Sequence, residues 1–119
     1  MIDIKKIEKI INLYAKGGMI IVVDDKDREN EGDLIISAEK IKPEDINFMI
    51  KEGRGLVCVT IDSDKAQQLN LTSMSPNNTS LHETNFTVSV DATKGTTTGI
   101  SAKDRWQTIQ VILENNSKP

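Results

Sequence analysis

The sequence has very little cysteine and histidine, because Cys58 and His82 are each the only residue of their kind in 119. A single cysteine excludes an internal disulfide, and one cysteine with one histidine is too few for a structural zinc cluster. This usage fits a reducing compartment, so we expect a cytoplasmic protein. His82 stands alone in a polar stretch, which is typical of a surface side chain rather than a metal ligand.

Aromatic residues, long apolar runs and a basic excess are also missing. The chain has four aromatic residues, so its core must be mostly aliphatic. The opening MIDIKKIEKI alternates charges with isoleucines and is typical of neither a signal peptide nor a membrane span. The net charge is −3, which disfavours nucleic-acid binding. With 37% hydrophobic and 28% charged residues, the composition is that of one folded domain, residues 1–119.

Helices and strands alternate in the predicted order of elements. Apolar residues at helical spacing predict helices near residues 4–14, 43–53, 63–69 and 101–113, with Asp62 or Ser63 as the N-cap of the third and Ser101 and Asp104 as a capping box for the last. Short β-branched or alternating runs predict strands at 19–23, 34–36, 56–61 and 86–90, of which 19–23 and 56–61 are typical of strands buried on both faces. We expect an α/β fold of the α+β type, with a mixed β-sheet flanked by helices.

The segment DDKDRENEGD is the strongest chemical signal in the sequence. It places six carboxylates in ten residues, directly after a predicted strand. Such a cluster is tolerated when solvent or a cation screens the repulsion, and the ends of strands in open α/β sheets commonly carry ligand-binding residues. The alternative is a solvated acidic turn without a ligand, because runs of charge are often only hydrated. An EF-hand is excluded, since its glycine position holds Asn30 and its last acid is replaced by Ile36.

Two further segments offer weaker signals. In KGTTTGIS, threonines between glycines precede the last predicted helix, where hydroxyls and free backbone amides suit an anion such as phosphate. A flexible turn is the more frequent meaning of such a string. In GRGLVC, the backbone permits close approach of a ligand beside Arg54 and Cys58. A helix end followed by a buried, inert cysteine is the commoner alternative there.

Taken together, DDKDRENEGD, GRGLVC, NNTS, FTVSVDA and GTTTGISAKDR resemble 3,4-dihydroxy-2-butanone 4-phosphate synthase, in the same order and over about residues 5–119. The resemblance implies a mixed sheet between helices, a homodimeric parent, and a divalent ion, Mg²⁺ or Mn²⁺. It implies conversion of ribulose 5-phosphate to the butanone phosphate and formate in riboflavin biosynthesis.

The resemblance also assigns roles to residues. Arg28, Glu29 and Asp33 correspond to substrate-binding positions, and Glu29 also to a metal ligand. Glu29, Glu31 and Asp33 are the candidate catalytic carboxylates, because an enediolate formed beside the ketone needs a cation to stabilise it and a carboxylate to move protons. The remaining substrate contacts that the resemblance implies are Cys58, Thr97 and Thr98, the threonines on the phosphate side.

The sequence departs from the family pattern beyond these motifs. Family members continue through an Arg-Pro-Gly-His segment, a Gly-His-Thr-Glu segment with a metal-binding histidine, and a later catalytic glutamate, none of which occurs here. We therefore expect the N-terminal part of the synthase, an incomplete version of its fold, inactive or severely weakened on its own. Two alternatives stay open, a non-catalytic module that binds a cation or sugar phosphate and a purely structural domain.

Overall fold

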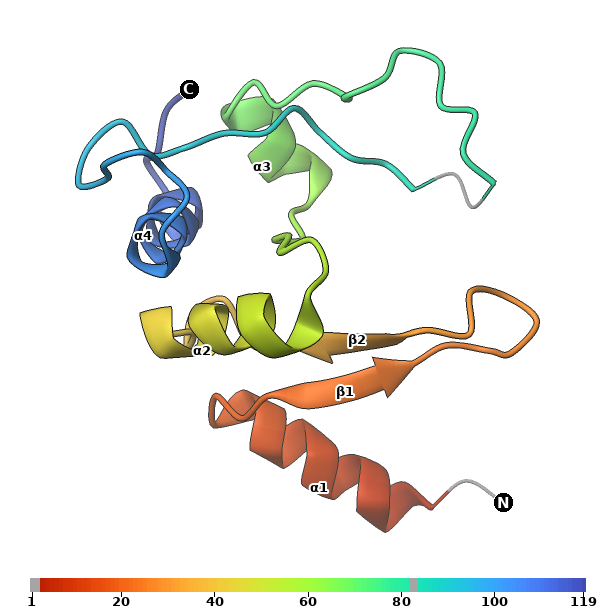
Figure 1. Cartoon of the computed structure of the whole chain (residues 1–119). Coiled ribbons are helices and arrows are strands. Elements are labelled where there is room, and N and C mark those ends of the chain that lie inside the picture. Colours follow the sequence, from red (N-terminus) through yellow and green to blue (C-terminus); the bar gives the residue numbers. More distant parts are fainter. Residues whose placement is uncertain (1–2, 82–83) are drawn as a thin grey trace. The chain divides into compact units, whose positions relative to one another are not determined.

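The computed structural model describes residues 3–81 and 84–119, so the surface position expected for His82 lies outside the described residues. The chain divides into two compact units, Met1–Val57 and Cys58–Pro119, and each is described here by itself (Figure 1). Helices and a β-hairpin confirm the α+β class. The single domain expected for residues 1–119 stays a prediction. None of the described helices is long and apolar enough to cross a bilayer.

Helix α1 (Ile4–Ala15) begins the first unit, as the spacing of its isoleucines predicts. The Asp3 side chain caps the helix by accepting a 3.2 Å hydrogen bond from the Lys6 amide. Gly17 follows with a φ of +89°, a left-handed conformation that glycine adopts without strain and that ends many helices. The helix contacts strand β1 (Ile20–Val23), although none of the helix residues is buried.

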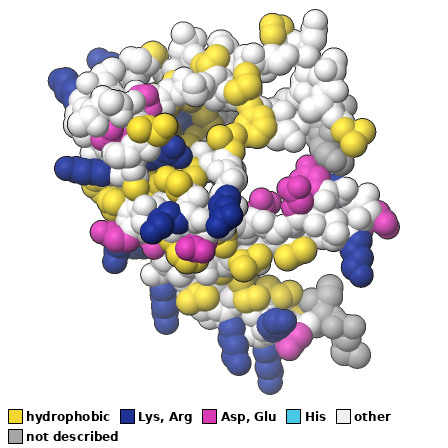
Figure 2. Space-filling model, in the orientation of Figure 1, with side chains coloured by type: hydrophobic (Ala, Val, Ile, Leu, Met, Phe, Trp, Pro, Cys, Tyr) yellow, Lys and Arg dark blue, Asp and Glu magenta, His cyan; other side chains and the backbone are white. Residues whose placement is uncertain are grey.

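Strand β1 pairs with β2 (Gly32–Ile35) in an antiparallel ladder that runs from Ile20 opposite Ile35 to Val23 opposite Gly32. The sheet of the described residues is therefore a two-stranded antiparallel hairpin and not the mixed sheet expected. The burial expected on both faces of β1 is also wrong, because Ile21 and Val23 are 67% and 66% exposed. Figure 2 shows the acidic side chains gathered at the tip of this hairpin.

Helix α2 (Pro43–Phe48) continues directly into a π-helical turn, η1 (Met49–Gly53), over the range where one helix was expected. Pro43 occupies the first helical position, where its missing N–H costs nothing. Asp45 accepts a 2.9 Å hydrogen bond from the Lys42 amide, which closes the start of the helix. Ile46 is completely buried and centres the small core of this unit, and Arg54 ends the turn at a φ of +55°.

The second unit is built on α3 (Ser63–Gln68) and α4 (Ala102–Leu113), both expected from the sequence. Asp62 and Ser101 are their N-caps, accepting hydrogen bonds from the amides of Lys65 and Asp104 at 2.7 and 3.0 Å. The buried apolar side chains of this unit come from α4 and the segments beside the two helices: Leu69, Ala92, Ile109 and Ile112. This core is small and aliphatic, as the scarcity of aromatic residues requires.

Two expected strands are absent from the described residues. The segment 56–61 forms no ladder, and Leu56 is 77% exposed. The segment 86–90 makes one isolated antiparallel bridge, Ser73 to Thr87, with hydrogen bonds from Met74 to Phe86 and from Val88 to Thr72. Both segments have strand-like sequences, but a strand exists only when a neighbour satisfies its backbone groups. Among the described residues, segment 56–61 has no such neighbour, and segment 86–90 has one only at the bridge around Thr87.

Candidate functional site

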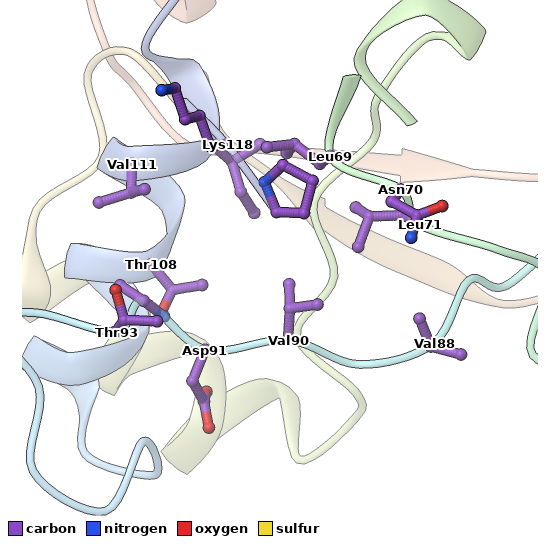
Figure 3. Close-up of a pocket in the computed structure, with 13 residues that line it drawn as sticks. Leu69, Asn70, Leu71, Val88, Val90, Asp91, Thr93, Thr108, Val111 and Lys118 are labelled. Atoms are coloured by element: carbon purple, nitrogen blue, oxygen red, sulfur yellow. The ribbon is translucent and has the colours of Figure 1, made fainter. Parts of the chain in front are cut away.

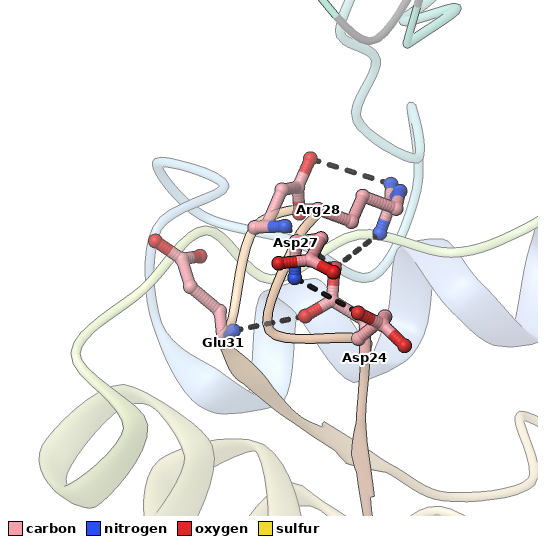
Figure 4. A network of polar contacts seen from close by, with 6 residues as sticks. Asp24, Asp27, Arg28 and Glu31 are labelled. Carbon is pink, nitrogen blue, oxygen red and sulfur yellow. Dashed lines mark hydrogen bonds and ion pairs between the residues drawn. The ribbon is translucent and has the colours of Figure 1, made fainter.

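The acidic loop at the hairpin tip is organised around Asp24, the first of its six carboxylates. Asp24 Oδ2 accepts from the Glu29 amide at 3.0 Å and from Arg28 Nη1 at 2.7 Å, and Oδ1 accepts from the Glu31 amide at 3.0 Å (Figure 4). The loop closes with a hydrogen bond from the Asp24 amide to the Glu31 carbonyl. Asp24 therefore serves as the internal anion that shapes the loop, a role the sequence did not indicate.

The charge on Asp24 is stabilised by this geometry. Desolvation is the largest single influence on its pKa and raises it. The backbone amides of Glu29 and Glu31, followed by the hydrogen bond and charge of Arg28, outweigh it, so the pKa of Asp24 lies below its ordinary value. Asp25 has a similar local role, because its Oδ1 accepts from the Asp27 amide at 2.8 Å. Part of the acidic segment is thus structural.

Three of the residues predicted to act on substrate, Arg28, Glu29 and Glu31, lie in the same loop, and Asp33 follows in strand β2. Arg28 bridges Asp24 and Glu29, with Nη2 at 3.3 Å from Glu29 Oε1. Figure 4 shows Glu31 pointing away from Asp24. Within the described part of the chain, the carboxylates of Glu31 and Asp33 accept no hydrogen bond, and both residues are exposed. The loop and the start of β2 therefore present the Arg28 guanidinium and several carboxylates to solvent.

The loop offers limited ligation for a metal ion. Among residues 3–81 and 84–119, no group of three or more histidine, cysteine or acidic residues is arranged to hold an ion. Both oxygens of Asp24 are occupied, whereas Glu29 is exposed and engages Arg28 through one oxygen only. Mg²⁺ is commonly bound by one or two carboxylates, with water and substrate oxygens completing its octahedron. The donors present fit such a partial site and do not fit a closed protein cage.

In the second unit, the threonine turn, residues 95–101, is held by a buried carboxylate. Asp104 is 2% exposed, and its Oδ2 accepts from the Thr97 hydroxyl at 2.7 Å, the Thr97 amide at 3.1 Å and the Gly99 amide at 3.0 Å. The amides expected to be free for an external anion therefore bind an internal one. Thr96 also turns inward and donates its hydroxyl to the Ala92 carbonyl at 2.7 Å.

Thr98 is the threonine that remains available. It is exposed, and its hydroxyl makes no hydrogen bond within the described residues. The Asp104 carboxylate beneath the turn is ionised, because the hydrogen bond from the Thr97 hydroxyl is the main influence that lowers its pKa. The amides of Thr97 and Gly99 and the Ser101 hydroxyl add to the effect, while desolvation opposes it. The sequence marked Asp104 only as part of a capping box.

Cys58 begins the second unit and is exposed, which contradicts the buried, inert cysteine weighed as the commoner alternative. The predicted site residues thus fall into two groups. Arg28, Glu29, Glu31 and Asp33 belong to the hairpin of the first unit. Cys58, Thr97 and Thr98 belong to the second unit, where the threonines share one turn.

The second unit also contains a cavity of about 300 Å³ (Figure 3). Its apolar lining comes from the residues that follow α3, the segment 88–92, α4 and the last residue of the chain: Leu69, Leu71, Val88, Val90, Ala92, Val111, Ile112 and Pro119. None of the predicted site residues lines this cavity. It is an opening in the apolar side of the unit and not the site that the motifs predict.

Comparison with known proteins identifies the family. The family model described as 3,4-dihydroxy-2-butanone 4-phosphate synthase matches residues 8–119. This chain belongs to the 3,4-dihydroxy-2-butanone 4-phosphate synthase family. The synthase of Histophilus somni is 46% identical over 115 residues, which are 97% of this chain and 54% of that protein. The riboflavin biosynthesis protein RibBA of Porphyromonas gingivalis is 49% identical over 119 residues, 29% of its length.

Solved structures of the synthase family agree with the fold. A 3,4-dihydroxy-2-butanone 4-phosphate synthase in complex with two magnesium ions is 38% identical with a TM-score of 0.90, and the match covers 95% of this chain and 53% of that one. A two-domain synthase from A. baumannii is 49% identical with a TM-score of 0.84, over 33% of its chain. The chain therefore spans about half the length of the single synthases it matches, as expected for their N-terminal part.

Proposed function

We propose that this chain supplies the acidic loop and the phosphate-side turn of a 3,4-dihydroxy-2-butanone 4-phosphate synthase. That activity converts ribulose 5-phosphate to 3,4-dihydroxy-2-butanone 4-phosphate and formate, in riboflavin biosynthesis. The observation that carries the proposal is the family match over residues 8–119. The ordered, solvent-facing loop with Arg28, Glu29 and Glu31 supports it, because these are the groups such a reaction requires.

We assign substrate and metal binding to some of the loop residues and proton transfer to others. Arg28 and Asp33 bind the polar groups of the sugar phosphate, and Glu29 binds both substrate and cation. The reaction begins with removal of a proton beside the ketone, for which exposed carboxylates such as Glu31, Asp33 and Glu29 are suitable bases. Arg28 is held by Asp24 at 2.7 Å, so its guanidinium is oriented before substrate arrives. Cys58 and Thr98 contribute contacts from the second unit, while the Thr97 hydroxyl, also predicted to contact substrate, is already donated to Asp104.

Magnesium is the cation we propose, because a solved relative is in complex with two magnesium ions. Glu29 would hold it, together with water and substrate oxygens. A divalent cation held there would supply positive charge to a substrate oxygen, while Glu29 would be its protein ligand. Manganese satisfies the same oxygen-ligand chemistry and is the alternative ion.

We further propose that these 119 residues alone bind substrate without normal turnover. The chain spans 54% of the Histophilus somni synthase, and the Gly-His-Thr-Glu segment that the family uses for its second metal contact is not among its residues. We propose a homodimeric, cytoplasmic parent protein in which residues 1–119 are part of one domain.

Isothermal titration with ribulose 5-phosphate and Mg²⁺, paired with a formate assay, tests this proposal. We expect saturable binding, with formate release far below that of the Histophilus somni synthase. Glu29→Gln should weaken Mg²⁺-dependent binding about tenfold or more, as expected for loss of a charge-assisted contact. Asp27→Asn is the matched control, because it removes the same charge from the same loop at a residue without an assigned role. Equal effects of both variants would contradict a specific role for Glu29.

A non-catalytic binding module is the second candidate function. The small number of possible metal ligands near Glu29 favours this function. Within the described ranges, no three histidine, cysteine or acidic residues are arranged to hold an ion. In that case, these residues would still bind sugar phosphate and cation. They would give no turnover even when joined to the rest of a synthase, and that result distinguishes the two functions.

A further inference from the structure

We propose that Asp104 is a positioning residue for the phosphate side of the site: its carboxylate fixes the threonine turn so that the Thr98 hydroxyl faces outward toward the sugar phosphate. This inference deepens the proposed function and rests on it. Three hydrogen bonds from the turn converge on one oxygen of Asp104, all between 2.7 and 3.1 Å. They come from Thr97 and Gly99, the residues on either side of Thr98.

The bonds of Asp104 differ from those of an ordinary capping residue. Asp45 holds the equivalent third helical position in α2 and accepts from the amide of its own N-cap residue, Lys42. Asp104 instead reaches five and seven residues back along the chain, beyond its N-cap Ser101, to Gly99 and Thr97. Capping a helix N-terminus requires a bond only to the amide of the N-cap residue and not to residues that precede it. The carboxylate is therefore placed to shape the turn itself.

The rest of α4 holds the same segment at its other points. The Thr108 hydroxyl accepts a 3.0 Å hydrogen bond from the Ala92 amide, and Arg105 Nε donates to the Ile100 carbonyl at 3.0 Å. The Thr96 hydroxyl donates a hydrogen bond to the Ala92 carbonyl. The segment 92–100 is thus bonded to α4 near both of its ends, and Asp104 holds its middle. Thr98 lies between the two held residues Thr97 and Gly99 and is exposed.

The buried carboxylate also limits how a phosphate can bind. The amides of Thr97 and Gly99 would form an anion site if they were free, but Asp104 already occupies them. A phosphate placed there would meet a negative charge in a buried position. The contact from this turn therefore comes from the exposed Thr98 side chain. This separates Thr97, whose hydroxyl holds the frame, from Thr98, whose hydroxyl is presented to ligand.

Gly99 supports the same interpretation of the turn. It has a φ of +86°, and a Cβ at this position would collide with the Asp91 carboxylate. Glycine is therefore required both by the left-handed backbone and by the close approach of Asp91. With Gly99 in this conformation, its amide points to Asp104, which completes the set of bonds on either side of Thr98.

Hydrogen exchange followed by nuclear magnetic resonance on the full 119-residue chain tests the positioning role directly. In Asp104→Ala, the amides of Thr97 and Gly99 should exchange at least about tenfold faster, because their acceptor is lost. Asp104→Asn keeps an acceptor oxygen without the charge and should give an intermediate effect. Asp45→Ala, which removes the matching acid from α2, should leave both amides unchanged. Unchanged exchange in Asp104→Ala, or equal acceleration in Asp45→Ala, would overturn the proposal.

Titration with ribulose 5-phosphate and Mg²⁺ connects the turn to its ligand. Thr98→Ala and Asp104→Ala should each weaken binding, and the double variant should be little weaker than either one, because both changes remove the same contact. Fully additive losses would overturn the link between Asp104 and Thr98. If the unaltered chain binds no ribulose 5-phosphate, the phosphate role of Thr98 is overturned together with the proposed function. The exchange data would still decide whether Asp104 holds the turn.

Discussion

The Arg28 guanidinium lies 2.7 Å from the Asp24 carboxylate, and the same carboxylate accepts hydrogen bonds from the backbone amides of Glu29 and Glu31. One aspartate thereby orients the residues that we assign to substrate and metal. Asp24 is not itself among the residues assigned to substrate. It therefore offers a way to disturb the site without removing any proposed contact.

Asp24→Ala should release Arg28 and loosen the loop, because three hydrogen bonds lose their acceptor. The amides of Glu29 and Glu31 should exchange at least about tenfold faster, measured by hydrogen exchange. Affinity for ribulose 5-phosphate should fall, since a disordered loop must be ordered again on binding. Asp27→Asn should change neither quantity. A loop that keeps its slow amides in Asp24→Ala would contradict the role given to this aspartate.

Ile46 should carry much of the stability of the first unit, because it is the one side chain that is completely buried among the described residues. Ile46→Ala should lower the free energy of unfolding by about 2–5 kcal/mol, and Ile46→Val by about 0.5–1.5 kcal/mol. Leu56→Ala, at a residue that is 77% exposed, should change it by no more than about 0.5 kcal/mol. Urea unfolding measures all three. Similar losses for Leu56 and Ile46 would contradict the small core described here.

The stability of the chain should fall in acid. The folded-state pKa values of Asp24 and Asp104 are lowered, so the stability that their ionised forms contribute is present above the ordinary aspartate pKa of about 3.9. It is lost as the pH falls through the folded-state values, below about 4. Unfolding measured between about pH 6 and pH 2.5 should show this loss.

Asp104→Asn distinguishes the loss of stability caused by protonation of Asp104 from the loss caused by protonation of the other carboxylates. The variant should show a shallower loss of stability with acid, because it lacks one of the two carboxylates whose pKa is lowered in the folded chain. An Asp104→Asn profile that overlays that of the unaltered chain would contradict the charge assigned to Asp104.

The helices were largely predictable because their signals are local. The spacing of isoleucines before Gly17 predicted α1, and the N-caps Asp62 and Ser101 predicted where α3 and α4 begin. The strands were less predictable, because pairing depends on residues distant in sequence or on other segments. Residues 56–61 and 86–90 have strand composition, yet the described residues provide neither segment with a full ladder.

The site was predictable as a set of motifs but not as a set of contacts. The sequence identified DRENEGD and GTTTG, and the structure adds that each turn is built on one aspartate, Asp24 in the first and Asp104 in the second. Charge counting treats all carboxylates of the loop alike, so it could not separate Asp24 from Glu29. The available signal was position: Asp24 directly ends a strand, and Asp104 follows a glycine-bounded turn.

Exposed apolar side chains should make the isolated chain associate. Ile4, Ile21 and Val23 of the first unit are each about two-thirds exposed, and unpaired strand edges add to the tendency. We expect the apparent mass to rise with concentration in size-exclusion chromatography with light scattering. Ile21→Thr with Val23→Thr keeps β-branched residues on the strand and should reduce the effect. A monomer at all concentrations would contradict this expectation.

The most direct test joins residues 1–119 to the remainder of the Histophilus somni synthase, in place of its matching N-terminal part, and measures formate release from ribulose 5-phosphate with Mg²⁺. We predict turnover by the hybrid, its abolition by Glu29→Gln, and its retention by Asp27→Asn. A folded hybrid that releases no formate, or a Glu29→Gln hybrid as active as the unaltered one, would contradict the account.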